Sequence, residues 1–380
     1  MILKVYRKFP WWSWILPLTV VAAGLSSLFL VQDASNAILE SADGTFEEVV
    51  LDPLAPGYES YVLSTPTHLV AIEGESGLAS VVLVSLFSDD RGGSALVFPV
   101  ELIISGERSV GEVFAGSSES DFLSDFGSYL GIGFDTFSIL NEDFLEYYFS
   151  VAGPLTVLSD DPLRKYVDGE AITVYEAGQI VLTANEVSNY LSWVNQGESP
   201  YNRWLRTKNF WNAWLESLTD TEIAIFNEME DQGELTRIMK GLSIGELFMP
   251  DLNIFEGKDS EGYLEIDIVS LKSVIFEIVP FPIAPFEGGR AEVKLIDGVG
   301  GVDLVNRFVP SLVASGAEIK LVGNALEFGV RESNVTYYDV AFSEFADNFA
   351  IALGGATVEF EPLSESAVDI TVLIGLSSID

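Results

Sequence analysis

Two arginines, Arg203 and Arg206, stand three residues apart in a stretch with helical spacing, so both side chains can lie on one face of a helix. Guanidinium groups in that arrangement can contact phosphate, because each offers several N–H donors in a fixed fork. They can equally face solvent and pair with an acid such as Glu198. The residues leave both interpretations open.

The residue types of most other catalytic sites are scarce. The chain has no cysteine, which excludes disulfides, thiolate metal sites and a cysteine nucleophile. Its one histidine, His68, is expected to be an ordinary loop or strand residue, because no second ligand or triad partner of the right type stands with it. No paired-carboxylate site stands out either, so a secreted hydrolase is poorly supported.

A glycine-rich segment, Asp297-Gly-Val-Gly-Gly301, follows an apolar strand pattern and precedes an amphipathic stretch over 302–314. Backbone N–H groups at such a point can cradle a phosphate. The spacing is not Gly-x-Gly-x-x-Gly, however, and no lysine closes the loop. We therefore expect a tight strand-to-helix turn.

The overall charge also limits the possible partners. Lys and Arg number 19 against 58 Asp and Glu, a formal net charge of −39. Such a surface repels phosphate backbones, so nucleic acid is not expected as a partner. The acidity serves solubility or adaptation to salt, or it gathers divalent cations.

An uncharged run of 21 residues, Trp11–Val31, is long enough to span a bilayer as a helix. Three basic residues precede it, and the next Lys or Arg is Arg91. This asymmetry places the N-terminus in the cytoplasm and the rest of the chain outside, in a single-pass cell-membrane protein. A cleaved signal peptide is the competing interpretation, although the sequence after the run is a mediocre cleavage site.

Strand and helix patterns alternate through the rest of the chain, which favours α/β layers around a sheet. Residues 32–66 are expected to form a tether that becomes an edge strand near 61–63, and Ser88–Gly93 a hairpin loop. The predicted strands are 69–72, 81–87, 94–104, 134–140, 155–158, 172–175, one or two within 263–279, 291–296, 317–322, 335–339, 357–360 and 368–375. The predicted helices are 122–130, 144–151, 183–194, 201–218, 219–240, 302–314 and 343–353.

These patterns resemble two domains of the LytR-CpsA-Psr (LCP) cell-envelope family. The tail domain resembles the small LytR C-terminal domain, with Asp297-Gly298 where that family usually has Asn-Gly. Residues 67–245 resemble the LCP catalytic domain. The strand end Val97-Phe-Pro-Val-Glu101 stands where the family has a Ser-Ile-Pro-Arg-Asp type motif. The helix Leu182-Thr-Ala-Asn-Glu-Val-Ser-Asn-Tyr-Leu-Ser-Trp-Val194 matches the frame of the family's Leu-Asp-Gly-Glu helix, and Arg203 and Arg206 match its following arginines.

The resemblance implies a polyprenyl-pyrophosphate-linked glycan as donor, peptidoglycan as acceptor and Mg²⁺ between the phosphates. It assigns Glu101, Arg203 and Arg206 as catalytic residues, with Glu101 also as the metal ligand. Several family positions are replaced. Val100, Ser192 and Val194 stand where the family has arginine, and Ala79 stands where it has a metal-binding aspartate. Asp89, Asp90 and Arg91 are close enough in the sequence to act as substitutes.

We therefore expect a membrane-anchored LCP-like protein of cell-wall biogenesis with weakened or lost transfer chemistry. The alternative is a non-enzymatic scaffold that binds a lipid-linked glycan or an envelope partner. The predicted segments are a cytoplasmic tail over 1–10, a transmembrane helix over 11–31, a tether over 32–66, an LCP-like domain with a mixed sheet over 67–245, a strand-containing linker over 246–289 and a LytR C-terminal-like α/β domain over 290–380.

Overall fold

The computed structural model describes residues 50–379, apart from 75–76, 230–232, 258–261 and 364–365. The predicted membrane helix over 11–31 and most of the tether lie outside the described residues. Among the helices that are described, none has both the length and the apolarity to cross a membrane. Residues Asp52–Asp380 form one unit that contains two hydrophobic cores.

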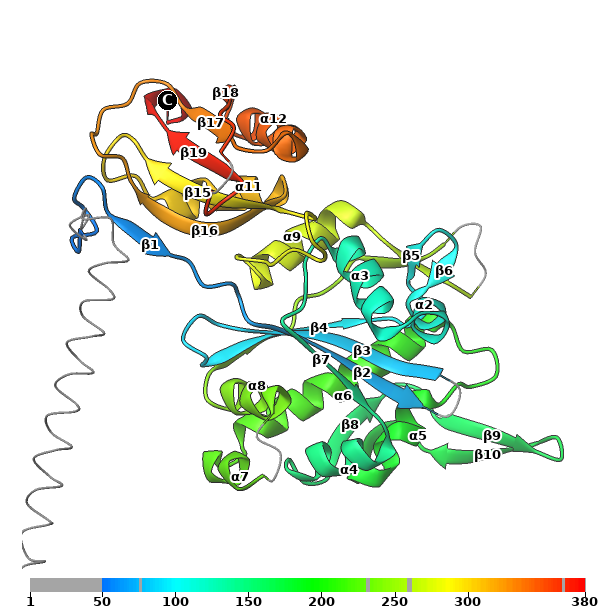
Figure 1. The fold of residues 1–380 in the computed structure, drawn as a ribbon. Helices are drawn as coiled ribbons and strands as arrows, with labels where there is room; N and C mark the ends of the chain where they lie inside the picture. Colours follow the sequence, from blue (N-terminus) through cyan, green and yellow to red (C-terminus); the bar gives the residue numbers. More distant parts are fainter. Residues whose placement is uncertain (1–49, 75–76, 230–232, 258–261, 364–365, 380) are drawn as a thin grey trace, which may run out of the picture. The chain divides into compact units, whose positions relative to one another are not determined.

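The first core surrounds a mixed five-stranded sheet with the order β12-β4-β3-β2-β7 (Figure 1). Strands β2, β3 and β4 are antiparallel neighbours, and β7 and β12 pair in parallel at the two edges. Every residue of β4 is buried, as expected for a central strand covered on both faces. The bounds are β2 Thr67–Gly74, β3 Gly77–Leu86, β4 Gly92–Phe98, β7 Thr136–Leu140 and β12 Glu246–Phe248. The predicted mixed sheet is confirmed.

Helices cover both faces of this sheet. Figure 1 shows α2, α3 and α9 on one side and α4 to α8 on the other. Their bounds are α2 Val110–Gly116, α3 Glu119–Leu130, α4 Glu142–Ser150, α5 Val187–Ser192, α6 Pro200–Thr219, α7 Ile223–Glu228, α8 Glu234–Ser243 and α9 Ile268–Ile278. Two-stranded ribbons surround this sheet: β5 Ile103–Ser105 with β6 Arg108–Ser109, β8 Leu155–Ser159 with β11 Gly178–Leu182, β9 Leu163–Val167 with β10 Glu170–Tyr175, and β13 Ile254–Glu256 with β14 Leu264–Ile266.

Three predicted elements were wrong in part. The strand predicted over 94–104 ends at Phe98. The helix predicted over 219–240 is divided between the end of α6, α7 and α8. The strands predicted within 263–279 amount to β14 only, and α9 follows at once. Its buried residues Leu271, Ile275 and Ile278 recur at helical spacing, and the Asp267 side chain caps its first turn at Val269 N–H. The first core decides this conformation, because α9 packs into it.

The second core lies under a six-stranded sheet with the order β1-β16-β15-β19-β17-β18. The tether supplies β1 at one edge, as predicted, and β1 is antiparallel to β16. The helix predicted over 302–314 is divided into two helices at Phe308, and a proline lies in the first turn of the second helix. The bounds are β1 Glu59–Tyr61, β15 Ala291–Asp297, α10 Leu304–Arg307, α11 Val309–Ala314, β16 Ala317–Asn324, β17 Asn334–Tyr337, α12 Ser343–Ala352, β18 Thr357–Phe360 and β19 Ile370–Ile374.

Candidate functional site

Helix α6 carries both candidate arginines. Ser199 caps its first turn at the N–H of Asn202, and Pro200 occupies a first-turn position where no backbone N–H is needed. Its core-facing side consists of aromatic and aliphatic residues that are almost fully buried: Trp204, Phe210, Trp211, Trp214, Leu215 and Leu218. These side chains belong to the first core.

A single hydrogen bond aligns α6 with the end of strand β4. The indole N–H of Trp204 donates to the carbonyl oxygen of Val97 over 2.9 Å in a buried position. Arg203, the preceding residue, then forms an ion pair with Glu101, which follows β4. Ala79 belongs to the same end of the sheet, because Val81 of β3 pairs with Phe98 of β4. The structure thus brings Arg203, Glu101 and Ala79 together at this end of the sheet.

A cavity of about 160 Å³ lies at this point, and we call it the Arg203 cavity. Its polar side chains are Arg203, Glu101 and Ser192. Its remaining wall is formed by Gly77, Leu78, Ala79, Val100, Leu191 and Val194. The volume equals that of roughly five liquid waters, so it suits a small anionic group and not a whole glycan.

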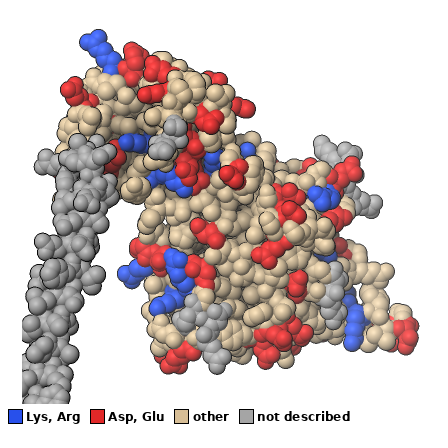
Figure 2. Space-filling model, in the orientation of Figure 1, with Lys and Arg blue, Asp and Glu red and all other residues tan. Residues whose placement is uncertain are grey.

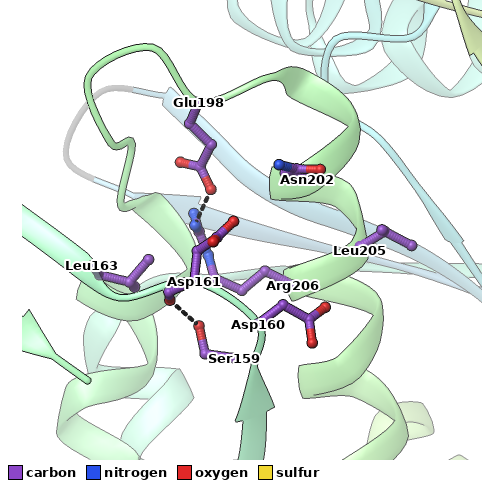
Figure 3. A pocket seen from close by; sticks show the side chains of 8 residues that line it. All are labelled: Ser159, Asp160, Asp161, Leu163, Glu198, Asn202, Leu205 and Arg206. Carbon is purple, nitrogen blue, oxygen red and sulfur yellow. Dashed lines mark hydrogen bonds and ion pairs between the residues drawn. The ribbon is translucent and has the colours of Figure 1, made fainter. Parts of the chain in front are cut away.

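Arg206 does not line the Arg203 cavity. Its guanidinium is paired with Glu198 (Figure 3). It also donates to the backbone carbonyl oxygen of Trp193. The two side chains are only 5% and 7% exposed and border a separate cavity of about 50 Å³. The pairing with Glu198 that the sequence left open is therefore confirmed for Arg206. Arg203 pairs with Glu101 instead.

The two opposite charges in the Arg203 cavity, those of Arg203 and Glu101, balance each other. The Arg203 and Glu101 side chains are 20% and 12% exposed, so solvent screens their pairing only in part. Burial, and secondarily the nearby charge of Arg206, lowers the pKa of Arg203. Two buried polar atoms, Arg203 Nε and Ser192 Oγ, have no hydrogen-bond partner among the described residues. Both atoms are enclosed by the protein, so they add no donor to the open surface of the cavity.

The lining fits Mg²⁺ poorly. Glu101 is the one carboxylate among the described lining residues, and it is held by Arg203. The described part of the chain contains no group of three acidic, histidine or cysteine side chains placed to hold a metal. Mg²⁺ prefers free carboxylate oxygens together with substrate phosphates. Mg²⁺ binding stays a prediction, and we derive no step through it.

The proposed substitutes for missing ligands lie elsewhere. Asp89, Asp90 and Arg91 belong to the turn before β4, at the opposite end of that strand from Glu101. Asp90 pairs with Arg237 of α8 at 3.2 Å. These residues form a hairpin tip and cannot replace a ligand in the Arg203 cavity.

The glycine-rich loop of the second core forms a turn that binds its own carboxylate. Buried Asp297 accepts hydrogen bonds from the N–H groups of Val299, Gly300 and Val302 at 2.8–2.9 Å. Positive φ at Gly300 and Gly301 allows the chain to wrap around it. The N–H groups that a phosphate would need are thus occupied, and the predicted strand-to-helix turn is confirmed.

No family model and no curated protein matches this sequence. Similar solved structures include B. subtilis TagV, with 13% identity and a TM-score of 0.44 over 57% of this chain and 98% of that one. A LytR-Csp2A-Psr enzyme from Actinomyces oris has 14% identity and a TM-score of 0.45 over 62% and 96% of the two chains. The structure titled TagT bound to LI-WTA has 12% identity and a TM-score of 0.42 over 57% and 89%.

At identities of 12–14% and TM-scores of 0.42–0.45, these similarities decide neither the fold nor the chemistry, which are argued from the residues. The sequence analysis identified the charged members of the Arg203 cavity. It missed the lining residues Gly77, Leu78 and Leu191. Their only signal in the sequence is proximity to Ala79 and Ser192, two positions where the family's polar residues are replaced.

Proposed function

We propose that this protein is a membrane-anchored, extracytoplasmic LCP-like protein of cell-wall biogenesis. In this proposal it binds a polyprenyl-pyrophosphate-linked glycan, or the peptidoglycan that accepts it, and its transfer chemistry is weakened or lost. The observation that carries the proposal is the Arg203–Glu101 ion pair in a cavity of phosphate-like size.

The charge in the cavity supports binding better than transfer. An arginine that stabilises developing charge in phosphoryl transfer contributes on the order of 10³-fold or more to the rate. Here the one guanidinium of the Arg203 cavity is already paired with a carboxylate. The resemblance places further arginines at Val100, Ser192 and Val194, and none of these residues can supply positive charge. Arg203 is the one positive charge among the described lining residues that a phosphate could contact.

A scaffold without any turnover is the second candidate function. The burial of Arg206 against Glu198 favours it, because this removes the second arginine from the cavity. Binding without chemistry needs only one complementary charge, whereas transfer needs charge placed where it develops in the transition state.

The extracellular location can be tested with single cysteines, since the chain has none. Glu170→Cys lies at an exposed position on the β9–β10 hairpin. We expect a membrane-impermeant maleimide to label it on intact cells, and to label Lys4→Cys only after permeabilisation. Labelling of Lys4→Cys on intact cells, or protection of Glu170→Cys, would contradict the proposed topology.

Ligand binding and turnover can be separated with the full chain in detergent micelles. We expect polyprenyl pyrophosphate to bind, with Mg²⁺ present or absent, and phosphate release to be slow or undetectable. Arg203→Ala should lose binding, whereas Lys208→Ala should retain it, because Lys208 is a half-buried lysine of the same helix that pairs with Asp251 outside the Arg203 cavity. Release that Arg203→Ala abolishes would establish a transferase-like enzyme. Failure of the wild-type chain to bind would reject the proposal.

A further inference from the structure

The guanidinium in the Arg203 cavity faces a competitor from its own chain. Glu101 follows strand β4 and Arg203 lies in the first turn of α6, so the ion pair joins segments about a hundred residues apart. The Trp204–Val97 hydrogen bond beside it holds these segments in place. The Glu101 carboxylate therefore stays at the arginine without needing a ligand to position it.

An incoming anion meets both charges together. Arg203 attracts it, while Glu101 repels it from a largely buried position where screening by water is reduced. The formal charge of the ion pair is zero, so an anion gains by entering only if it displaces the Glu101 carboxylate from the guanidinium, and an anion of higher charge gains more from that exchange. Arg203 Nε and Ser192 Oγ, which have no hydrogen-bond partner among the described residues, are enclosed by the protein and add no donor for that anion.

We propose that Glu101 is a specificity-determining residue that competes with ligands for Arg203. The inference rests on the proposed function only in taking the Arg203 cavity as the ligand site. Glu101 admits anions that carry more negative charge than one carboxylate, such as pyrophosphate, and excludes carboxylates and singly charged phosphodiesters. In the metal-ligand role that the resemblance implies, Glu101 strengthens phosphate binding. As a competitor, it weakens phosphate binding.

The two roles predict opposite effects of one substitution. Inorganic pyrophosphate and inorganic phosphate are titrated separately into the full chain in detergent by calorimetry, once without divalent cations and once with Mg²⁺. Glu101→Gln keeps the shape of the side chain and removes its charge. It should tighten pyrophosphate binding roughly tenfold or more and make phosphate binding measurable, because the repulsion between like charges is gone. Adding Arg203→Ala to this variant should abolish the gain.

Glu198→Gln is the matched control, since Glu198 holds the neighbouring arginine outside the Arg203 cavity. It removes the same charge and should leave both affinities unchanged. Equal gains in the two variants would overturn the proposal, because the cause would then be the general acidity of the chain. Weaker pyrophosphate binding by Glu101→Gln in the presence of Mg²⁺ would overturn it as well and favour the metal-ligand role.

A second variant, Glu101→Asp, tests the proposal if Glu101→Gln does not fold. Glu101→Asp keeps the charge but withdraws it from the guanidinium by one methylene, so pyrophosphate should bind about two- to threefold more tightly. An unchanged or lower affinity would count against the proposal. The lipid assay on the wild-type chain is independent of this result. If that chain fails to bind polyprenyl pyrophosphate while Glu101→Gln gains pyrophosphate affinity, the proposed function fails and the role of Glu101 stands.

Discussion

Arg203 and Arg206 lie one turn apart on α6, and each pairs with a glutamate, but their surroundings differ. Arg206 and Glu198 are enclosed, and the guanidinium also binds the carbonyl oxygen of Trp193, so this pair joins α6 to the loop that precedes it. Arg203 and Glu101 border the larger of the two cavities, about 160 Å³ against about 50 Å³, and retain more exposure. The comparison shows that the surroundings, and not the residue types, distinguish the two ion pairs.

The charge of the protein gives this comparison its context. Figure 2 shows acidic side chains across the visible face of the described residues, with Lys and Arg in small groups. In a chain of formal charge −39, carboxylates far outnumber guanidinium groups, so an arginine readily forms an ion pair within the chain. An arginine intended for a ligand must therefore compete with the protein's own acids, and Arg203 does so in a cavity where a ligand can take part.

Breaking the enclosed pair should have the largest effect. We expect Arg206→Ala to lower the free energy of unfolding by about 3–5 kcal/mol, because it leaves the Glu198 carboxylate buried without its partner. Arg206→Lys should recover only part of this loss, since an ammonium group cannot reproduce the guanidinium fork that binds Glu198 and the Trp193 carbonyl. Urea unfolding followed by tryptophan fluorescence reports on the first core and not on the second, because the tryptophans of the described residues are Trp193, Trp204, Trp211 and Trp214. A loss below about 1 kcal/mol would show that the pair is not structural.

Much of this arrangement could be predicted from local sequence. The apolar runs of β2, β3 and β4 are continuous because both faces are buried, and the aromatic spacing of α6 marks its core side. The meeting of Arg203 with Glu101 followed from the motif order. What could not be predicted depends on contacts distant in the sequence. The helix α9 has Val and Ile residues that suit a strand equally well, and packing in the first core decides between the two.

The placement of Arg203 and Arg206 at different cavities could not be predicted from the sequence either. A spacing of three residues places both on one helical face, which is true of their backbone positions. The return of residues 193–198 onto α6 brings Glu198 to Arg206 and turns that side chain away from the Arg203 cavity. Loop geometry of this kind has no periodic signal in the sequence.

His68 makes its own contribution to the pH dependence of stability, and this contribution must be known before the two ion pairs are compared at low pH. His68 is 1% exposed, its Nδ1 lies 2.5 Å from Thr136 Oγ1, and burial lowers its pKa to about 4. The unfolded state, with a pKa near 6.5, binds the proton first, so stability falls as the pH drops from about 6.5 towards 4. We expect a loss of about 2 kcal/mol between pH 7 and pH 5. His68→Gln should remove this dependence in urea titrations; an unchanged slope would assign it to carboxylates instead.

Breaking the Arg203–Glu101 pair should lower the free energy of unfolding less than breaking the Arg206–Glu198 pair. Arg203→Ala should lower the free energy of unfolding by about 1 kcal/mol, because the cavity lets water reach the Glu101 carboxylate once the guanidinium is gone. Lys208→Ala, which breaks a pair with exposed Asp251, sets the surface baseline at about 0.5 kcal/mol or less. The same fluorescence-detected urea titration measures both variants. A cost for Arg203→Ala equal to that of Arg206→Ala would mean that both pairs are structural, and Glu101 would then be too firmly held for a ligand to displace.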